Sequence, residues 1–146
     1  MVDKIKKLRE LTNACVVECR KALLEAKGDV AKAREILKKN GILIAEKKSD
    51  RTLGAGVLKA YIHNNRIGVL LEVRCETDFA AQSREFQELA QLLAFQIAAT
   101  RAATVKELLK APYIKDENMT VDDLIKSVVA QVKERIQIER FTRYEF

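Results

Sequence analysis

The hydrophobic pattern of the first 41 residues predicts three short helices, because apolar residues return every three or four positions in three successive segments. Gly28 can adopt the positive φ that ends a helix, Asp29 can cap the next helix, and Gly41 can end the third. We therefore expect a three-helix module over 1–41 and a charged linking helix over 42–54. The repeating apolar positions are Ile5, Leu8 and Leu11, then Cys19, Ala22, Leu23 and Ala26, and finally Val30, Ala33, Ile36 and Leu37.

The hydrophobic period changes to strict alternation after residue 56. Residues 58–63 and 67–75 each alternate between two sets of side chains, which is the period of a β-strand. Asn64 and Asn65 separate them, and asparagine tolerates the positive φ of a tight turn. The pattern predicts a β-hairpin.

A helical pattern returns from Asp78 to about Thr100, and Thr77 or Asp78 can cap its start. One apolar stripe follows this predicted helix, wide enough to cover a face of the hairpin. A shorter helix is predicted over 105–110. The stripe consists of Phe79, Phe86, Leu89, Ala90, Leu93 and Ile97.

The C-terminal residues predict a further helix and a third strand. Thr120 and Asp123 have the spacing of a capping box, so a helix is expected to begin there. Residues 136–146 are rich in β-branched and aromatic side chains, which predicts a strand. Their alternation slips between Ile138 and Phe141, which indicates either a bulge or an end of the strand where both faces are covered. The predicted fold class is α+β, in which residues 55–146 form a three-stranded antiparallel sheet packed on helices.

The charge of the chain leaves a nucleic-acid partner as an alternative. The 27 lysines and arginines exceed the 21 acidic residues, and 13 of the basic residues lie in the first 50 positions beside 8 acids. This interleaving is typical of solvated amphipathic helices and not of a basic tract that follows phosphates. A small basic nucleic-acid-binding or ribosome-binding protein therefore stays the second interpretation.

The sequence lacks two features that would direct the protein to a membrane or out of the cell. No apolar run approaches the roughly 20 residues that span a membrane, and the charged residues at the N-terminus do not resemble a secretory signal. The three cysteines form an odd set, which favours free thiols in a reducing compartment. We expect a cytoplasmic protein.

The cysteines and the single histidine offer little metal or thiol chemistry. Cys15 and Cys19 are four residues apart, but no further ligand lies near them in the sequence to complete a metal site. A catalytic thiol among the three cysteines would need His63 beside it. Small, partly buried residues are the favoured interpretation, and no metal or cofactor is expected.

No phosphate-binding loop, metalloprotease helix or nucleophile elbow occurs in the chain, so a binding or regulatory protein is favoured over an enzyme. The segment from Cys75 to Phe79 is unusual because a predicted strand runs directly into a helix. Asp78 suits the positive end of that helix. Phe79 either begins the buried stripe or projects as a wedge toward a partner, and its spacing from Phe86 alone favours burial.

Three separated segments in the same order resemble the elongation factor Ts family, the nucleotide exchange factors of elongation factor Tu. They are LRELTNACVVECRKALLEAKGDVAKAREILKKNG, YIHNNRIGVLLEVRCETDFA, and PYIKD with TVDDLI and IQIERFTRYEF. The resemblance covers essentially the whole chain. It implies a ubiquitin-associated-like N-terminal module, a core like that of the compact members, and a role in translation without enzymatic chemistry.

The resemblance also implies the residues that contact elongation factor Tu. Thr77, Asp78, Phe79 and Ala80 match the family's Thr-Asp-Phe-Val tetrapeptide, with alanine in place of valine. In the implied mechanism Phe79 pushes between helices of the GTPase domain while Asp78 engages polar groups beside it. This displacement dislocates Mg²⁺ from the nucleotide site and promotes release of GDP.

Further contacts are implied at two other places. Thr12, Asn13, Ala14 and Cys15 stand where the family usually has Thr-Gly-Ala-Gly, the N-terminal turn that docks on the GTPase domain. His63, in the hairpin, is a further candidate contact. A free-standing ubiquitin-associated-like adaptor is a third interpretation, but it leaves residues 55–146 without a role.

A second copy of the chain is an expected partner. Helices on one side of a three-stranded sheet leave the other face short of cover, and exposed apolar patches mark partner surfaces. A homodimer is therefore a possible partner arrangement, and it would rebuild the double core of longer members. We expect no contact with a membrane and no direct contact with nucleic acid. Candidate residues for the open face are Tyr61, Leu70, Phe141, Tyr144 and Phe146.

Overall fold

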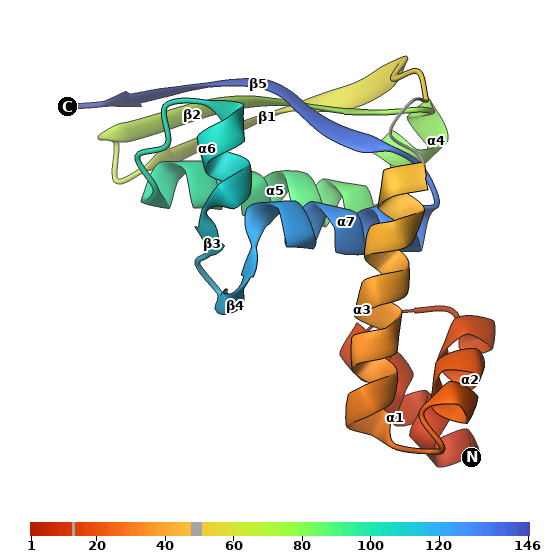
Figure 1. The fold of residues 1–146 in the computed structure, drawn as a ribbon. Helices are drawn as coiled ribbons and strands as arrows, with labels where there is room; N and C mark the ends of the chain where they lie inside the picture. Colours follow the sequence, from red (N-terminus) through yellow and green to blue (C-terminus); the bar gives the residue numbers. More distant parts are fainter. Residues whose placement is uncertain (13, 48–50) are drawn as a thin grey trace.

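The computed structural model describes residues 1–12, 14–47 and 51–146, with the side chains of 42–47 left aside. An N-terminal group of three helices stands beside a core in which helices cover one face of a three-stranded sheet (Figure 1). The predicted α+β class and architecture are therefore confirmed. The N-terminal helices are α1 (Val2–Thr12), α2 (Val16–Glu25) and α3 (Val30–Lys47).

The N-terminal helices bury their own small apolar cluster, separate from the main core. The turn between α2 and α3 is built as predicted, because Gly28 has a φ of +83° and Asp29 Oδ1 accepts from the Ala31 amide at 2.9 Å. The arrangement is compatible with a ubiquitin-associated-like module. The cluster consists of Leu8, Cys19, Ala22, Leu23, Ala26 and Ala33.

The prediction that Gly41 ends the third helix is wrong, since α3 continues to Lys47. Gly41 lies against α7, where a β-carbon would meet the Cβ of Ala130 at 3.2 Å. The glycine therefore permits a close helix crossing and does not act as a terminator. The division into units over 1–41, 42–54 and 55–146 stays a prediction.

The sheet is antiparallel in the order β1-β2-β5. Asn64 and Asn65 have φ values of 51° and 57°, and the Arg66 amide donates to the His63 carbonyl at 3.0 Å, which confirms the predicted turn. The slip in alternation between Ile138 and Phe141 is a bulge, because the register of β5 shifts between the partners of Glu72 and Val73. The strands are β1 (Ala55–His63), β2 (Ile67–Cys75) and β5 (Ile136–Glu145).

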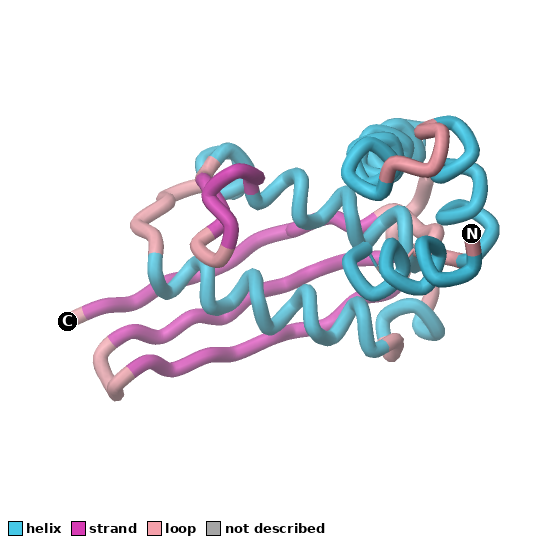
Figure 2. Tube along the Cα trace, turned by 90° about the horizontal axis from the view of Figure 1, so that it is seen from below, coloured by secondary structure: helices cyan, strands magenta, loops and turns pink. Residues whose placement is uncertain are grey.

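The helices of the core lie on a single face of the sheet, and α5 and α7 run across the strands when viewed from the helix side (Figure 2). The capping box of Thr120 and Asp123 begins α7 as predicted. A small two-stranded ribbon precedes it, and the sequence pattern does not predict this ribbon. These elements are α4 (Asp78–Ala81), α5 (Arg84–Ala99), α6 (Val105–Lys110), β3 (Pro112–Tyr113), β4 (Asp116–Thr120) and α7 (Val121–Val132).

The single helix predicted from Asp78 to Thr100 is two helices. α4 ends after one turn, and Ser83 then caps α5 by accepting from the Phe86 amide at 3.3 Å. The predicted apolar stripe is otherwise confirmed. Its buried members are Phe86, Leu89, Ala90, Leu93 and Ile97.

Two residues assigned to the open face of the sheet lie on the covered face instead. Tyr61 packs edge-on against Phe95 of α5, with the ring centroids 4.5 Å apart. Phe141 is opposite the buried Leu71 in the register and packs on the main core. Among the described residues, the helices are too short or too polar for any of them to cross a membrane.

Candidate functional site

The candidate site is the junction where β2 ends and α4 begins. Cys75 is the last residue of β2, and Thr77 is still extended, with φ −131° and ψ 153°. The Thr77 side-chain oxygen accepts from the Ala80 amide at 3.3 Å, which identifies Thr77 as the N-cap of α4. A strand thus becomes a one-turn helix within two residues.

Phe79 projects into solvent from this helix with 88% of its surface exposed. The prediction that it begins the buried stripe is wrong, because the break at Ser83 interrupts the helical phase that would have joined it to Phe86. Ala80 and Ala81 face the core in its place. Burying a phenylalanine stabilises a fold by roughly 1.5–3 kcal/mol, and the chain forgoes this gain at Phe79.

The one-turn helix is held at its C-terminal end as well. The Ser83 hydroxyl donates to the Ala80 carbonyl at 2.6 Å, and the side-chain amide of Gln87 donates to the Ala81 carbonyl at 2.7 Å. Since Ala80 and Ala81 are also buried, the backbone below Phe79 is fixed by hydrogen bonds and by packing. Thr77 and Asp78 are exposed beside Phe79.

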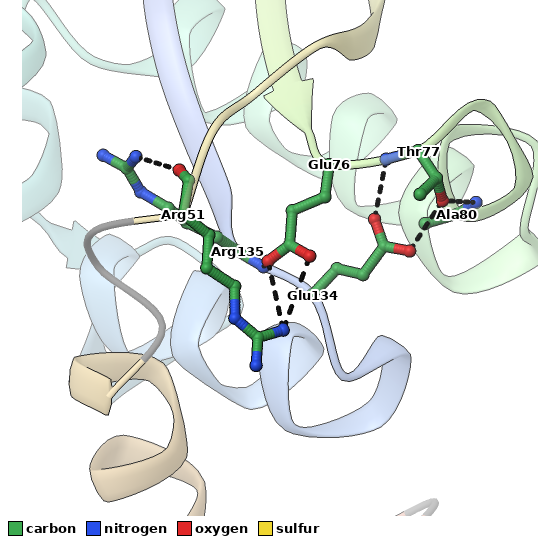
Figure 3. Close-up of polar contacts among 6 residues, drawn as sticks. All are labelled: Arg51, Glu76, Thr77, Ala80, Glu134 and Arg135. Atoms are coloured by element: carbon green, nitrogen blue, oxygen red, sulfur yellow. Dashed lines mark hydrogen bonds and ion pairs between the residues drawn. The ribbon is translucent and has the colours of Figure 1, made fainter.

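The start of α4 is joined to the segment between α7 and β5 (Figure 3). The Glu134 carboxylate accepts from the Thr77 amide at 2.9 Å and from the Thr77 hydroxyl at 2.6 Å. In the other direction, the Glu76 carboxylate accepts from the Arg135 amide at 2.8 Å. Arg51 adds an ion pair to Glu76 at 3.4 Å.

Cys75 lies behind this junction as a buried free thiol. Burial raises the pKa of the Cys75 thiol, and the negative charge of Glu134 raises it further. The protonated sulfur donates to the Thr77 carbonyl at 3.2 Å. Cys75 therefore acts as a structural residue at this junction.

His63 lies at the far end of the sheet from Phe79. Residue 63 is opposite Ile67 at the beginning of β2, whereas Cys75 ends this strand, about 26 Å away for eight residue steps. The two ring nitrogens of His63 face the Tyr61 hydroxyl at 2.9 Å and the Asn64 side chain at 3.2 Å. A single copy of the chain therefore does not bring the two candidate contacts together, and Cys75 has no access to His63.

The turn between α1 and α2 is a second candidate surface. The Thr12 hydroxyl donates to the Leu8 carbonyl at 2.7 Å, and Cys15 is the exposed N-cap residue of α2. Ala14 and Thr12 line a groove between the N-terminal helices and α7. Asn13 lies outside the described residues.

Exposed apolar side chains flank this turn, and two of them, Val16 and Val17, were not predicted from the sequence. Leu11, which was expected on the inner face of the first helix, is 52% exposed. Val16 and Val17 are exposed at the start of α2. Two adjacent valines at the start of a predicted helix, outside its buried face, were the signal in the sequence for an exposed apolar surface.

The N-terminal helices are joined to the candidate site by charge. Lys133, the residue before Glu134, forms an ion pair with Glu18 of α2. Partial burial raises the pKa of Glu18, but hydrogen bonds from Lys133 and Cys15 together with the Lys133 charge outweigh it, so the pKa is lowered. Within residues 1–12, 14–47 and 51–146, no group of three or more histidines, cysteines and acidic residues is arranged to hold a metal ion.

Fold and site together define a class of protein: a two-layer α+β core with an N-terminal helical module and one aromatic side chain held outward at a strand–helix junction. Residues 76–146 match the family model described as elongation factor TS. The chain is 42% identical to elongation factor Ts of Thermotoga sp. (strain RQ2), in an alignment of 188 positions covering 99% of this chain and 94% of the relative. The chain therefore belongs to the elongation factor Ts family.

Two further relatives extend this comparison. Elongation factor Ts of Nostoc sp. (strain PCC 7120) is 44% identical over 141 positions, which cover 96% of this chain and 44% of the relative. The chloroplastic elongation factor Ts of Cyanidioschyzon merolae is 38% identical, and the alignment covers 99% of this chain and 92% of the relative. Membership of this family makes the protein a translation elongation factor.

Proposed function

We propose that this protein binds elongation factor Tu in its GDP-bound form and promotes the release of GDP, so that GTP can replace it. The observation that carries the proposal is the outward position of Phe79, 88% exposed on a helix turn that is fixed at both ends. A single exposed aromatic residue is common on protein surfaces. A rigidly mounted one beside Asp78, in a chain of this family, supports the interpretation as a wedge.

In the proposed mechanism Phe79 inserts between helices of the GTPase domain and Asp78 contacts polar groups next to it. The movement displaces Mg²⁺, which requires near-ideal octahedral geometry and bridges the protein to the nucleotide phosphates. Because coupling is reciprocal, a factor that weakens GDP binding is itself released when nucleotide binds. The protein accelerates exchange without catalysing a covalent step.

The N-terminal helices are proposed to dock on the same GTPase domain. Their turn at Thr12–Cys15 is flanked by the exposed Leu11, Val16 and Val17, an apolar surface suited to a partner helix. Docking there would supply affinity, whereas Phe79 would act on the nucleotide site. His63 stays a proposed contact at the other end of the sheet.

We also propose that the working species contains two copies of the chain. The face of the sheet opposite the helices carries Leu70 and Tyr144, which are 52% and 76% exposed. A second copy related by a two-fold axis would cover this face with the same surface. Such a pair would also place the hairpin of one copy and Phe79 of the other within one assembly.

Stopped-flow release of a fluorescent GDP from elongation factor Tu tests the exchange function. Addition of the protein should accelerate release, with a rate that rises and then saturates as its concentration increases. Excess unlabelled GDP should reduce binding of the protein to elongation factor Tu, because the two ligands oppose each other. Unchanged release at micromolar protein would contradict the proposal.

A further inference from the structure

Glu134 is bound to Thr77 by two hydrogen bonds, although 57 residues separate them in the chain. One carboxylate oxygen accepts from the Thr77 amide at 2.9 Å, and the other accepts from the Thr77 hydroxyl at 2.6 Å. Hydrogen bonds to a charged acceptor are shorter and stronger than neutral ones. Glu134 thus fixes both the backbone and the side chain of the residue that begins α4 (Figure 3).

The second of these bonds determines the direction of the Thr77 hydroxyl. A hydroxyl has one proton to donate and two lone pairs. Since the proton points to Glu134, the lone pairs are free to face the Ala80 amide, 3.3 Å away. Glu134 therefore orients the N-cap of the helix that carries Phe79.

The one-turn helix needs this support because it is short. α4 has four residues, and the first turn of a helix is the unfavourable step of helix formation. The N-cap and the burial of Ala80 and Ala81 fix the turn from within. Glu134 adds an anchor from a different part of the chain.

Glu134 is itself held in place by the neighbouring residues. Lys133 ends α7 with a φ of 62°, and Arg135 donates its amide to Glu76 at 2.8 Å. Arg135 also donates to the Arg51 carbonyl at 2.5 Å. Each of the two segments therefore places a carboxylate on the backbone amide of the other: Glu134 on residue 77, and Glu76 on residue 135.

Building on the exchange function proposed above, we propose that Glu134 is the positioning residue that holds Phe79 in the orientation engaged by the partner. It is half-buried, and its two hydrogen bonds are made to Thr77, the first residue of the tetrapeptide that carries Phe79. Its contribution is preorganisation, because a turn that is already ordered loses less conformational freedom on binding. Glu134 belongs to the working part of the site although it lies outside the Thr77–Ala80 tetrapeptide.

Glu134→Ala is expected to lower the maximal exchange rate about fivefold, the factor that corresponds to loss of a helix N-cap. The concentration for half-maximal exchange should change by less than about twofold, because a wedge acts on the nucleotide site and docking occurs elsewhere. Glu134→Gln is nearly isosteric but has one acceptor oxygen instead of two, so it can keep the bond from the Thr77 amide and loses the one from the Thr77 hydroxyl. Its maximal rate should therefore lie between those of the parent protein and Glu134→Ala. Glu139→Ala, an exposed glutamate on β5, is the matched control and should exchange normally.

The same substitution in a Phe79→Ala background separates positioning from general damage. If Glu134 acts through Phe79, Glu134→Ala should cause no further loss when Phe79 is already absent. An equal fractional loss in both backgrounds would overturn the proposal. So would an unchanged maximal rate for Glu134→Ala in the presence of Phe79.

Hydrogen exchange of the Ala80 amide gives a readout that does not depend on elongation factor Tu. Glu134→Ala should speed this exchange about fivefold while amides of β2 keep their protection. Unchanged protection at Ala80 would overturn the positioning role. If protection is lost but Phe79→Ala exchanges GDP as fast as the parent protein, the exchange role of Phe79 is wrong and Glu134 has no exchange function to support.

Discussion

A β-carbon on Gly41 would lie 3.2 Å from the Cβ of Ala130, so α3 and α7 meet at the glycine. Helices can approach this closely where the residues at the crossing are small. A glycine inside a helix costs about 1 kcal/mol relative to alanine. The contact through which α3 packs on the core therefore depends on a residue that weakens the helix itself.

Gly41→Leu should lower the free energy of unfolding by about 1–3 kcal/mol, because the added side chain must displace α7. Gly41→Ala should be close to neutral, since better helix propensity offsets a mild crowding of Ala130. Urea denaturation followed by circular dichroism measures both. Lys39→Leu, at an exposed position of the same helix, is the control, and equal stability of the two leucine variants would contradict the close crossing.

Phe79→Ala should lower the exchange rate at least tenfold, a loss of about 1.4 kcal/mol of transition-state stabilisation. Its melting temperature should stay that of the parent protein, because the ring is 88% exposed and its removal leaves no cavity. Stopped-flow release of fluorescent GDP and a thermal melt check the two parts. Ile114→Ala, which removes an exposed apolar side chain from the turn between β3 and β4, should retain full exchange.

Much of the fold can be predicted from short local patterns in the sequence. Asn64 and Asn65 predict their turn because few residues tolerate positive φ, and Thr120 with Asp123 predicts the capping box because the spacing is specific. The prediction at Gly41 is wrong because a glycine can either end a helix or permit close packing of two helices. Only the tertiary contact with Ala130 distinguishes these two roles.

The candidate site was predictable in part. The spacing between Phe79 and Phe86 predicts that both lie on one buried helix face. Ser83 begins a new helix between them, but a single serine is a weaker indication in the sequence than the apolar periodicity. The resemblance pointed to the wedge where the periodicity did not. The contact between Glu134 and Thr77 joins distant parts of the chain, so no local pattern could indicate it.

Val17→Asp should raise the concentration of protein needed for half-maximal exchange, with little change in the maximal rate. Val17 is 61% exposed on the surface proposed to dock, and a carboxylate there would lose its hydration on contact with an apolar partner. A titration of the exchange rate against protein concentration measures both quantities. Leu24→Asp, 58% exposed further along α2, is the matched control, and equal effects of the two would contradict a docking role for this turn.

The ion pairs of Glu72 should make stability depend on acid pH. The pKa of Glu72 is lowered, chiefly by the hydrogen bond from Arg140. Burial raises this pKa, but the hydrogen bond from Arg74 and the charges of both arginines lower it further, so the net direction is downward. The contribution is therefore present above the ordinary glutamate pKa of about 4.3 and is lost as pH falls through the lower value in the folded state. Both arginines lie 2.7 Å from the carboxylate.

Urea denaturation at pH 7 and at about pH 3 should show that Glu72→Gln loses less stability on acidification than the parent protein. The sign follows because the unfolded chain takes up the proton at higher pH than the folded protein does. Glu139→Gln is the control, because the Glu139 carboxylate contacts only the Gln137 side chain, at 3.4 Å, among the hydrogen bonds of the described residues. This variant should lose as much stability on acidification as the parent protein. A Glu72→Gln variant as sensitive to acid as the parent would show that this ion-pair cluster does not contribute.

The open face of the sheet brings together apolar residues from all three strands. In the register Ala60 of β1 and Thr142 of β5 flank Leu70, whereas Ile62 and Tyr144 flank Gly68. Leu58 adds a further exposed side chain next to Glu72. Two such faces can stack about 10 Å apart, as paired sheets do.

Leu70→Asp should prevent the proposed pairing, because Leu70 is on the central strand and a two-fold axis would bring the two carboxylates close together in an apolar interface. Sedimentation equilibrium over a dilution series should give twice 16.5 kDa for the parent protein and 16.5 kDa for the variant. Ile114→Asp, outside this face, should pair like the parent. A stable pair buries on the order of 2,000 Å², so it should persist at micromolar concentration. If the parent protein keeps a mass of 16.5 kDa into the high micromolar range and still promotes GDP exchange fully, the open face does not pair with a second copy, and a single chain acts on elongation factor Tu.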